Sequence, residues 1–262
     1  MPAVQTRLDI SAVTIASVDQ KQFMQSGSLV TRATTFEGRS VVDRHNRPIR
    51  SAQSVEVQVA LYSDVSTNVR AGMKDISAFT LGGNSFAGYL NSITINKSYS
   101  HSNTQGDGAL WTFPVYTGED TTGSISLMIP LADYPDFIAA VDGTAQSAVN
   151  LDLSLTVNSV TISIPCMVGS ITNTIPQDGM QMIELELLGV GVATSPSGTS
   201  SLLAAALNAP ETAVAINAVT KSSNGGTWAG NGLVQSLSIS CSEGSPLITS
   251  LTYASQGTWT IT

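Results

Sequence analysis

A short pattern occurs three times in this chain and points to a repeated β-hairpin. It consists of an apolar residue, any residue, serine, isoleucine or leucine, and serine or threonine. Its copies are Leu90–Thr94, Val168–Thr172 and Val234–Ser238. Repetition of strand-forming residues favours an architecture that uses one supersecondary unit several times. The chain is therefore expected to be mainly β.

An acid-glycine pair and a second run of alternating residues follow each copy. The pairs are Asp107-Gly108, Asp178-Gly179 and Glu243-Gly244. The alternating runs end at Gly118, Gly189 and Gly257. An Asp-Gly pair between alternating stretches is the strongest short-range signal for a β-hairpin. Each copy thus predicts a strand, a tight turn and a second strand.

The composition suits neutral strand faces that neighbouring subunits cover. Serine and threonine number 63 of the 262 residues, and charged residues make up only 11%. A secreted protein with a Ser/Thr-rich surface is the alternative, but Met1–Arg7 has no apolar signal-peptide core behind its charge. The best apolar run, Leu185–Ala193, is too short to span a membrane as a helix. Cys166 and Cys241 are interpreted as small apolar strand residues.

Charge is divided unevenly along the chain. Residues 1–97 hold ten of the eleven Lys and Arg against seven acids, which gives about +3. Residues 98–262 hold Lys221 alone against twelve acids, which gives about −11. An overall charge of −8 repels phosphate, so specific binding to nucleic acid is not expected.

A long polar connection separates two early predicted strands, Ala12–Val18 and Ser54–Leu61. Its centre, Glu37–Arg50, carries four arginines. They are Arg39, Arg44, Arg47 and Arg50. Such a run forms either a solvated hairpin tip or an interaction arm, and arginine suits bidentate pairing with carboxylates. The acidic remainder of the same molecule favours an arm that contacts another subunit.

Helical signals are few and short, and the chain is expected to fold as two β-sandwich or barrel-forming units. The two candidate helices are Leu131–Val141 and Ser200–Leu207. The first unit covers residues 1–145 and carries the long Arg-rich loop. The second covers residues 146–262, with a looser insert at about 190–232 that is rich in Gly, Pro and Ser.

Residues able to do chemistry are scarce. The chain has two histidines, His45 and His101, and no phosphate-binding loop, dinucleotide fingerprint or metal-ligand spacing. Glu184 and Glu186 lie two apart on one predicted strand face, where they could serve as acid and base or form an acidic wall. We expect no catalytic residues, no bound metal and no organic cofactor.

The order of strand, short pattern, acid-glycine turn, long strand and closing glycine resembles the β-sandwich unit of bacteriophage tail tube proteins. The residues that carry the resemblance are Met167–Gly189 and Gly232–Gly257. The resemblance covers about half of the chain. The resemblance implies stacked rings with six-fold or pseudo-six-fold symmetry, a continuous inner β-barrel, and a long early loop that contacts the adjacent ring.

On this resemblance the loop that carries Arg39, Arg44, Arg47 and Arg50 would be the subunit-interaction arm. Asp178, Glu184 and Glu186 are candidates for an acidic lumen that keeps passing DNA from sticking. The length of the chain departs from a simple single-domain tube protein, so a duplicated unit is expected as one possibility. The ring is then either a hexamer or a trimer of duplicated units.

The sequence thus predicts a structural virion protein, a tail tube subunit that assembles with itself and with other tail or capsid proteins. It would be assembled in the host cytoplasm and reside in the virion, where DNA passes through transiently. One alternative is a capsid decoration or cement protein. A further alternative is a carbohydrate-binding or carbohydrate-active β-sandwich that stacks sugars on Trp111, Trp228 or Trp259.

Overall fold

The structure is a computed structural model and describes most of the chain. It covers residues 3–39, 46–62, 75–104, 111–145, 151–157, 160–175, 180–191, 206–221 and 226–262. Strand accounts for 77% of it, which confirms the predicted mainly β fold.

The elements follow one another as a series of β-hairpins. The first strands are β1 (Ala3–Ile15), β2 (Val18–Asp19), β3 (Met24–Arg39), β4 (Asn46–Leu61), β5 (Ile76–Leu81) and β6 (Asn84–Ser85). The middle elements are η2 (Ala87–Tyr89), β7 (Leu90–Thr104), β8 (Phe113–Pro130), α1 (Tyr134–Ala145) and β9 (Leu151–Val157). The last strands are β10 (Val160–Thr174), β11 (Met180–Gly189), β12 (Val214–Thr220), β13 (Thr227–Ser242) and β14 (Ile248–Ile261).

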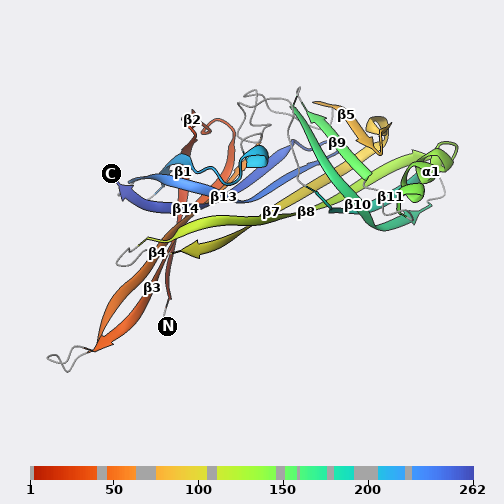
Figure 1. The fold of residues 1–262 in the computed structure, drawn as a ribbon. Helices are drawn as coiled ribbons and strands as arrows, with labels where there is room; N and C mark the ends of the chain where they lie inside the picture. Colours follow the sequence, from red (N-terminus) through yellow and green to blue (C-terminus); the bar gives the residue numbers. More distant parts are fainter. Residues whose placement is uncertain are drawn as a thin grey trace.

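One hydrogen-bonded sheet contains all the strands that the structure describes. Its order is β12-β1-β3-β4-β14-β13-β7-β8-β11-β10-β9-β5-β6, and all named pairs are antiparallel. Because β12 also pairs with β13, the strands from β12 to β13 close into a barrel. The strands from β7 to β5 continue outward from β13 (Figure 1).

The pairing registers reveal that the chain contains the same arrangement twice. Ser26 pairs with Ala60 in the β3–β4 hairpin, and Ser92 pairs with Ser126 in the β7–β8 hairpin. The difference in residue number is the same from Ser26 to Ser92 as from Ala60 to Ser126, and we call it the repeat offset. It also relates the outer register irregularities, Thr34/Thr35 and Ser100/His101. β1–β4 and β5–β8 are therefore two copies of one backbone pattern.

The later hairpins repeat in the same way. Val168 pairs with Leu187 in β10–β11, and the repeat offset leads from this pair to Val234 and Tyr253, which pair in β13–β14. β9 pairs with both β5 and β10, just as β12 pairs with both β1 and β13. We call β5–β11 the central unit, and β1–β4 together with β12–β14 the terminal unit. Figure 1 shows the terminal unit in red, orange and blue beside the central unit in yellow and green.

These units are not contiguous blocks, because the central unit is inserted between the two parts of the terminal unit. Strand pairing therefore crosses the expected boundary at residue 145, since β8 pairs with β11 and β7 pairs with β13. The division into 1–145 and 146–262 stays a prediction about domains, because pairing alone does not establish which segments fold independently.

The repeated sequence pattern encodes a β-bulge. The register shifts between Leu90 and Ser92, between Val168 and Ser170, and between Val234 and Ser236, so the second residue of each copy is the extra one. β3 has the same shift between Met24 and Ser26. This fourth copy escapes sequence analysis because Gly27 replaces the isoleucine or leucine. A bulge bends a strand and increases its twist.

The ends of the predicted hairpins differ in part from expectation. Gly244 has φ 74°, which suits its turn, whereas the pairs Asp107-Gly108 and Asp178-Gly179 lie outside the described residues. Gly189 ends β11 as predicted, but β8 runs past Gly118 to Pro130. β14 likewise runs past Gly257 to Ile261, so neither of these two glycines ends its strand as predicted.

The early connection is more regular than a loop. β3 and β4 continue as a hairpin to the pair Arg39 and Asn46, so only residues 40–45 of the predicted loop lie outside the described residues. Figure 1 shows this hairpin projecting away from the rest of the molecule. Sequence analysis did not predict strands here, because Thr35–Arg50 shows no apolar alternation. We call residues 34–52 the arm.

Helix is limited to short segments among the described residues. α1 begins three residues later than the predicted Leu131–Val141 helix and overlaps it. Of the predicted Ser200–Leu207 helix, residues 206–208 are helical and residues 200–205 lie outside the described part. Cys166 and Cys241 are buried in β10 and β13, as expected for small apolar strand residues.

A glycine in β13 permits close packing of the barrel. A Cβ added at Gly230 would lie 2.5 Å from the ring of Trp259, which is 5% exposed and whose Nε1 donates to the Asn231 carbonyl at 3.0 Å. Gly230→Ala is therefore expected to lower the free energy of unfolding by about 1–3 kcal/mol. Denaturant titration measures this. Gly118→Ala, which meets nothing, is the control, and equal losses in both would contradict the packing argument.

Candidate assembly surface

The contact between the two units is a seam of antiparallel strands. Along it β7 pairs with β13, from Ser92 opposite Ser242 to Ser98 opposite Ser236. The inward-facing residues of β13 at this seam are all buried. They are Leu237 at 2%, Ile239 at 2% and Cys241 at 4% exposure. The seam thus joins two equivalent units both by ladder hydrogen bonds and by a shared apolar core.

The strand of the central unit that corresponds to β13 has no such partner among the described residues. β9 pairs with β10 only as far as Cys166, so the stretch from Met167 to Thr174 pairs only with β11. Apolar side chains on and beside this stretch are exposed, with Met167 at 45%, Ile171 at 36% and Ile175 at 68%. A free strand edge with exposed apolar residues is a template for pairing with another chain.

The outward face of the sheet near the seam is lined with hydroxyl and amide groups. It spans β10, β11, β8, β7, β13 and β14. Its partly or fully exposed residues include Ser170, Thr172, Ser124, Ser126, Thr94, Asn96, Ser98, Ser236, Ser238 and Ser250. Within it Ser238 Oγ donates to Asn96 Oδ1 at 2.7 Å. Hydroxyl and amide side chains predominate on this face, as the composition predicts.

The acidic candidates lie on the same face where the structure describes them. Glu184 and Glu186 are both exposed on β11, opposite Thr172 and Ser170 of β10. Ser170 Oγ donates to Glu186 Oε2 at 3.0 Å. Asp178 lies outside the described residues. Sequence periodicity predicted the shared face of the two glutamates correctly, whereas their position on a channel wall stays a prediction.

The arginines belong to the arm. Arg39 ends β3, Arg47 and Arg50 lie in β4, and Arg44 falls outside the described residues. The arm and β11 lie at opposite ends of the molecule in Figure 1, so the structure does not bring the arginines and the two glutamates together within one chain. Pairing between these groups would require two copies, which is the arrangement predicted from the charge division.

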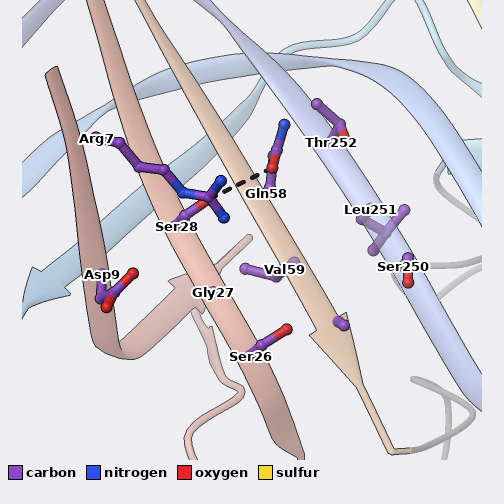
Figure 2. A pocket seen from close by; sticks show the side chains of 11 residues that line it. Arg7, Asp9, Ser26, Gly27, Ser28, Gln58, Val59, Ser250, Leu251 and Thr252 are labelled. Carbon is purple, nitrogen blue, oxygen red and sulfur yellow. Dashed lines mark hydrogen bonds between the residues drawn. The ribbon is translucent and has the colours of Figure 1, made fainter.

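A hollow of about 400 Å³ lies where β1, β3, β4 and β14 meet on the polar face (Figure 2). Ser28 Oγ donates to Gln58 Oε1 at 3.3 Å on its floor. Figure 2 shows Arg7 extending over β3 toward this pair, with Asp9 beside it on β1. Its lining is polar and open, and no sequence signal singled it out.

Sequence analysis missed a buried polar cluster in the central unit. Lys97, which is 1% exposed, forms an ion pair of 2.9 Å with Glu119. Burial lowers the pKa of Lys97, and Glu119 opposes that shift. Tyr116 Oη donates to Glu119 Oε2 at 3.3 Å, and Tyr99 Oη donates to the Ala206 carbonyl at 2.6 Å. The cluster therefore fastens the segment near residue 206 to the sheet.

His101 borders this cluster and titrates below its usual range, because burial lowers its pKa despite an opposing backbone hydrogen bond. The unfolded chain binds a proton near pH 6.5, while the folded protein resists it, so stability falls as pH drops below about 6.5. His101→Gln should flatten this dependence, measured as the free energy of unfolding between pH 7.5 and 5. An unchanged pH slope in the variant would refute the assignment. His45 lies outside the described residues.

The tryptophans offer little support for a sugar platform. Trp259 is buried, and Trp111 and Trp228 are half-buried and pack against the core. Within the described residues no three His, Cys, Asp or Glu side chains gather as metal ligands. The expectation that the protein is not an enzyme stays a prediction.

Membrane-spanning helices were sought in the same part of the chain. None of the helices described there has the length and apolar character needed to cross a bilayer.

Comparisons with known proteins give a weak structural likeness. No protein-family model matches the chain, and no curated protein is similar to it in sequence. Among solved structures, a chain of the "Virion of native gene transfer agent (GTA) particle" aligns with 14% identity and a TM-score of 0.37. The alignment covers 47% of this chain and 95% of the other. A likeness at this TM-score carries no argument about function.

Proposed function

We propose that the protein is a structural virion protein, a phage tail tube subunit that assembles into stacked rings around a channel for DNA. The observation that carries the proposal is the duplicated unit with one seam closed inside the chain and an equivalent strand edge left open. The chain therefore contains the completed seam between β7 and β13, and in β10 it contains one strand of an equivalent seam that a second copy could complete.

Two different parts of the chain are available for contact, and this favours a closed ring or a filament. The central unit presents the free edge of β10, and the terminal unit presents the arm formed by β3 and β4. Contact between two different surfaces is heterologous, so each added copy exposes a new site of the same kind. Such growth stops only by closure, which also removes exposed strand edges.

The duplication bears on the number of chains in a ring. Each chain supplies two equivalent units in a single continuous sheet. If the ring has the pseudo-six-fold symmetry that the resemblance to tail tube proteins implies, three chains complete it. The hydroxyl-rich face that carries Glu184 and Glu186 would then line the channel, and the two carboxylates would repel the phosphates of passing DNA.

Electron microscopy and light scattering of the purified protein test the proposal. We expect rings or tubes in negative stain, and a molar mass that rises with protein concentration in steps of three chains. A protein that stays monomeric yet binds preformed capsid shells would instead be a decoration or cement protein. A protein that stays monomeric and binds glycans would support the carbohydrate alternative, and either result would overturn the tail tube assignment.

A further inference from the structure

The edge of β3 is the counterpart of the edge of β7 that forms the internal seam. The repeat offset places residues 26–32 of β3 where residues 92–98 of β7 stand. In the central unit this edge pairs with β13. In the terminal unit the edge pairs instead with the first residues of β1, from Ala3 opposite Thr34 to Asp9 opposite Ser28. The start of β1 thus occupies the position that β13 holds in the seam.

β1 consists of two parts that are held differently. Its later part pairs with β12 and is fixed in the barrel by Ile10, Val13 and Ile15, which are at most 1% exposed. Its first part pairs with β3, apart from the Asp9 carbonyl, which accepts a hydrogen bond from the Lys221 amide at 2.8 Å. Only Leu8 among residues 5–9 is even half-buried. A register irregularity after Ile10 separates the two parts. The first part is held mainly by ladder hydrogen bonds, which another strand can replace one for one.

The free edge of β10 carries the features that such a replacing strand needs. β10 corresponds to β13 by the repeat offset, so Ile171 and Ile175 stand where Leu237 and Cys241 stand in the seam. Leu237 and Cys241 are 2% and 4% exposed, whereas Ile171 and Ile175 are 36% and 68% exposed. The two isoleucines are therefore at seam positions that lack a partner within the described chain, and burying them favours exchange.

We infer that residues 3–9 guard the edge of β3 and that β10 of a second copy displaces them during assembly. The incoming strand then takes the register of the internal seam, with Ser170 opposite Arg32, Ile171 opposite Thr31 and Ile175 opposite Gly27 of the neighbouring copy. This inference rests on the proposed self-assembly. It adds that residues 3–9 cover the edge of β3 in a single chain until another copy binds. An uncovered strand edge would otherwise be free to pair with other chains and aggregate.

Charge on the polar face is compatible with this register. Arg32 already pairs with Glu56 at 2.8 Å and is half exposed at its side chain. In this register Ser170 lies opposite Arg32. Glu186, which accepts a hydrogen bond from Ser170, lies on β11, the strand next to β10 on the side away from Arg32. Arg32 would then lie between two carboxylates. Displacement also removes Arg7 and Asp9 from the rim of the hollow in Figure 2.

A reversible disulfide tests whether residues 3–9 must leave the edge of β3 before the protein assembles. Thr6 lies directly opposite Thr31 in the β1–β3 ladder, and facing Cα atoms in antiparallel strands are within disulfide reach. The Thr6→Cys/Thr31→Cys variant should stay monomeric when oxidised and assemble at the wild-type rate after reduction. The reduced variant is its own control. Normal assembly of the oxidised variant, with the disulfide verified by mass spectrometry, would overturn the inference.

A second crosslink tests the register. The Thr31→Cys/Ile171→Cys variant should form disulfides between copies in assembled material, seen as a ladder of covalent oligomers on a non-reducing gel. Thr31→Cys/Thr172→Cys is the matched control, because Thr172 lies one residue along and faces the other side of the strand. Equal ladders in both variants, or none in either, would overturn the register. If wild-type protein itself forms no assemblies, the proposed function fails first, and this inference falls with it.

Discussion

Replacing Lys97 with methionine is expected to lower the free energy of unfolding by about 3–5 kcal/mol, because it leaves a carboxylate buried without its partner. The Lys97 ammonium lies 2.9 Å from Glu119, whose side chain is only 10% exposed. The second oxygen of Glu119, Oε1, is buried without a hydrogen bond in the described structure. The ion pair with Lys97 and the hydrogen bond from Tyr116 thus compensate the cost of burying the Glu119 carboxylate.

The terminal unit shows what a neutral version of this pair looks like. Thr31 and Gln53 occupy the positions that correspond to Lys97 and Glu119. The Lys97→Met/Glu119→Gln variant should therefore lose much less stability than Lys97→Met alone. Urea denaturation of both variants measures the difference. If the single and the double variant lose similar free energy of unfolding, the unpaired carboxylate is not the cause of the destabilisation.

Replacing Arg39, Arg44, Arg47 and Arg50 together with serine is expected to slow assembly at least about ten-fold while folding is retained, because opposite charges steer association. The four residues belong to the arm, which projects away from the sheet (Figure 1), whereas Glu184 and Glu186 are exposed at the other end of the molecule. Individual exposed pairs contribute only about 0–1 kcal/mol, so the arm acts through several contacts together.

Light scattering after a concentration jump measures the assembly rate, and circular dichroism measures folding. Raised salt should slow the wild type and have little effect on the four-arginine variant, because salt screens exposed charges. Lys21→Ser/Lys221→Ser removes two exposed cations outside the arm and is the control. If the four-arginine variant assembles at the wild-type rate, the arm is only a solvated hairpin.

The local features of the fold were readable from the sequence. Three copies of one five-residue pattern predicted the strands of three hairpins, and the structure shows that the pattern marks a bulge at its second residue. Period-two alternation also placed Glu184 and Glu186 on one exposed face. These signals are local, because a bulge and a strand face depend on neighbouring residues and on the burial of one side.

Sequence analysis missed features that have no local signal. The arm reads as a loop because no apolar face marks its strands, and Lys97 reads as a surface residue because its partner Glu119 lies on the next strand. The fourth bulge at Met24–Ser26 was hidden by a single glycine. The resemblance to tail tube proteins suggested a duplicated unit, and the division into residues 1–145 and 146–262 stays a prediction.

The amino-acid sequence alone was enough to establish a mainly β protein built from repeated hairpins, with a charge division that separates an arginine arm from an acidic body. The strand pairing was needed to establish that the repeats form two interleaved units, that β7 and β13 close a seam, and that β10 leaves the equivalent edge open. The physical reason is that antiparallel register is kept by backbone hydrogen bonds, which any side chains of suitable shape permit. Most residues differ between the two units while the repeat offset in the pairing is the same, so the strand pairing shows the repetition more clearly than the amino acids do.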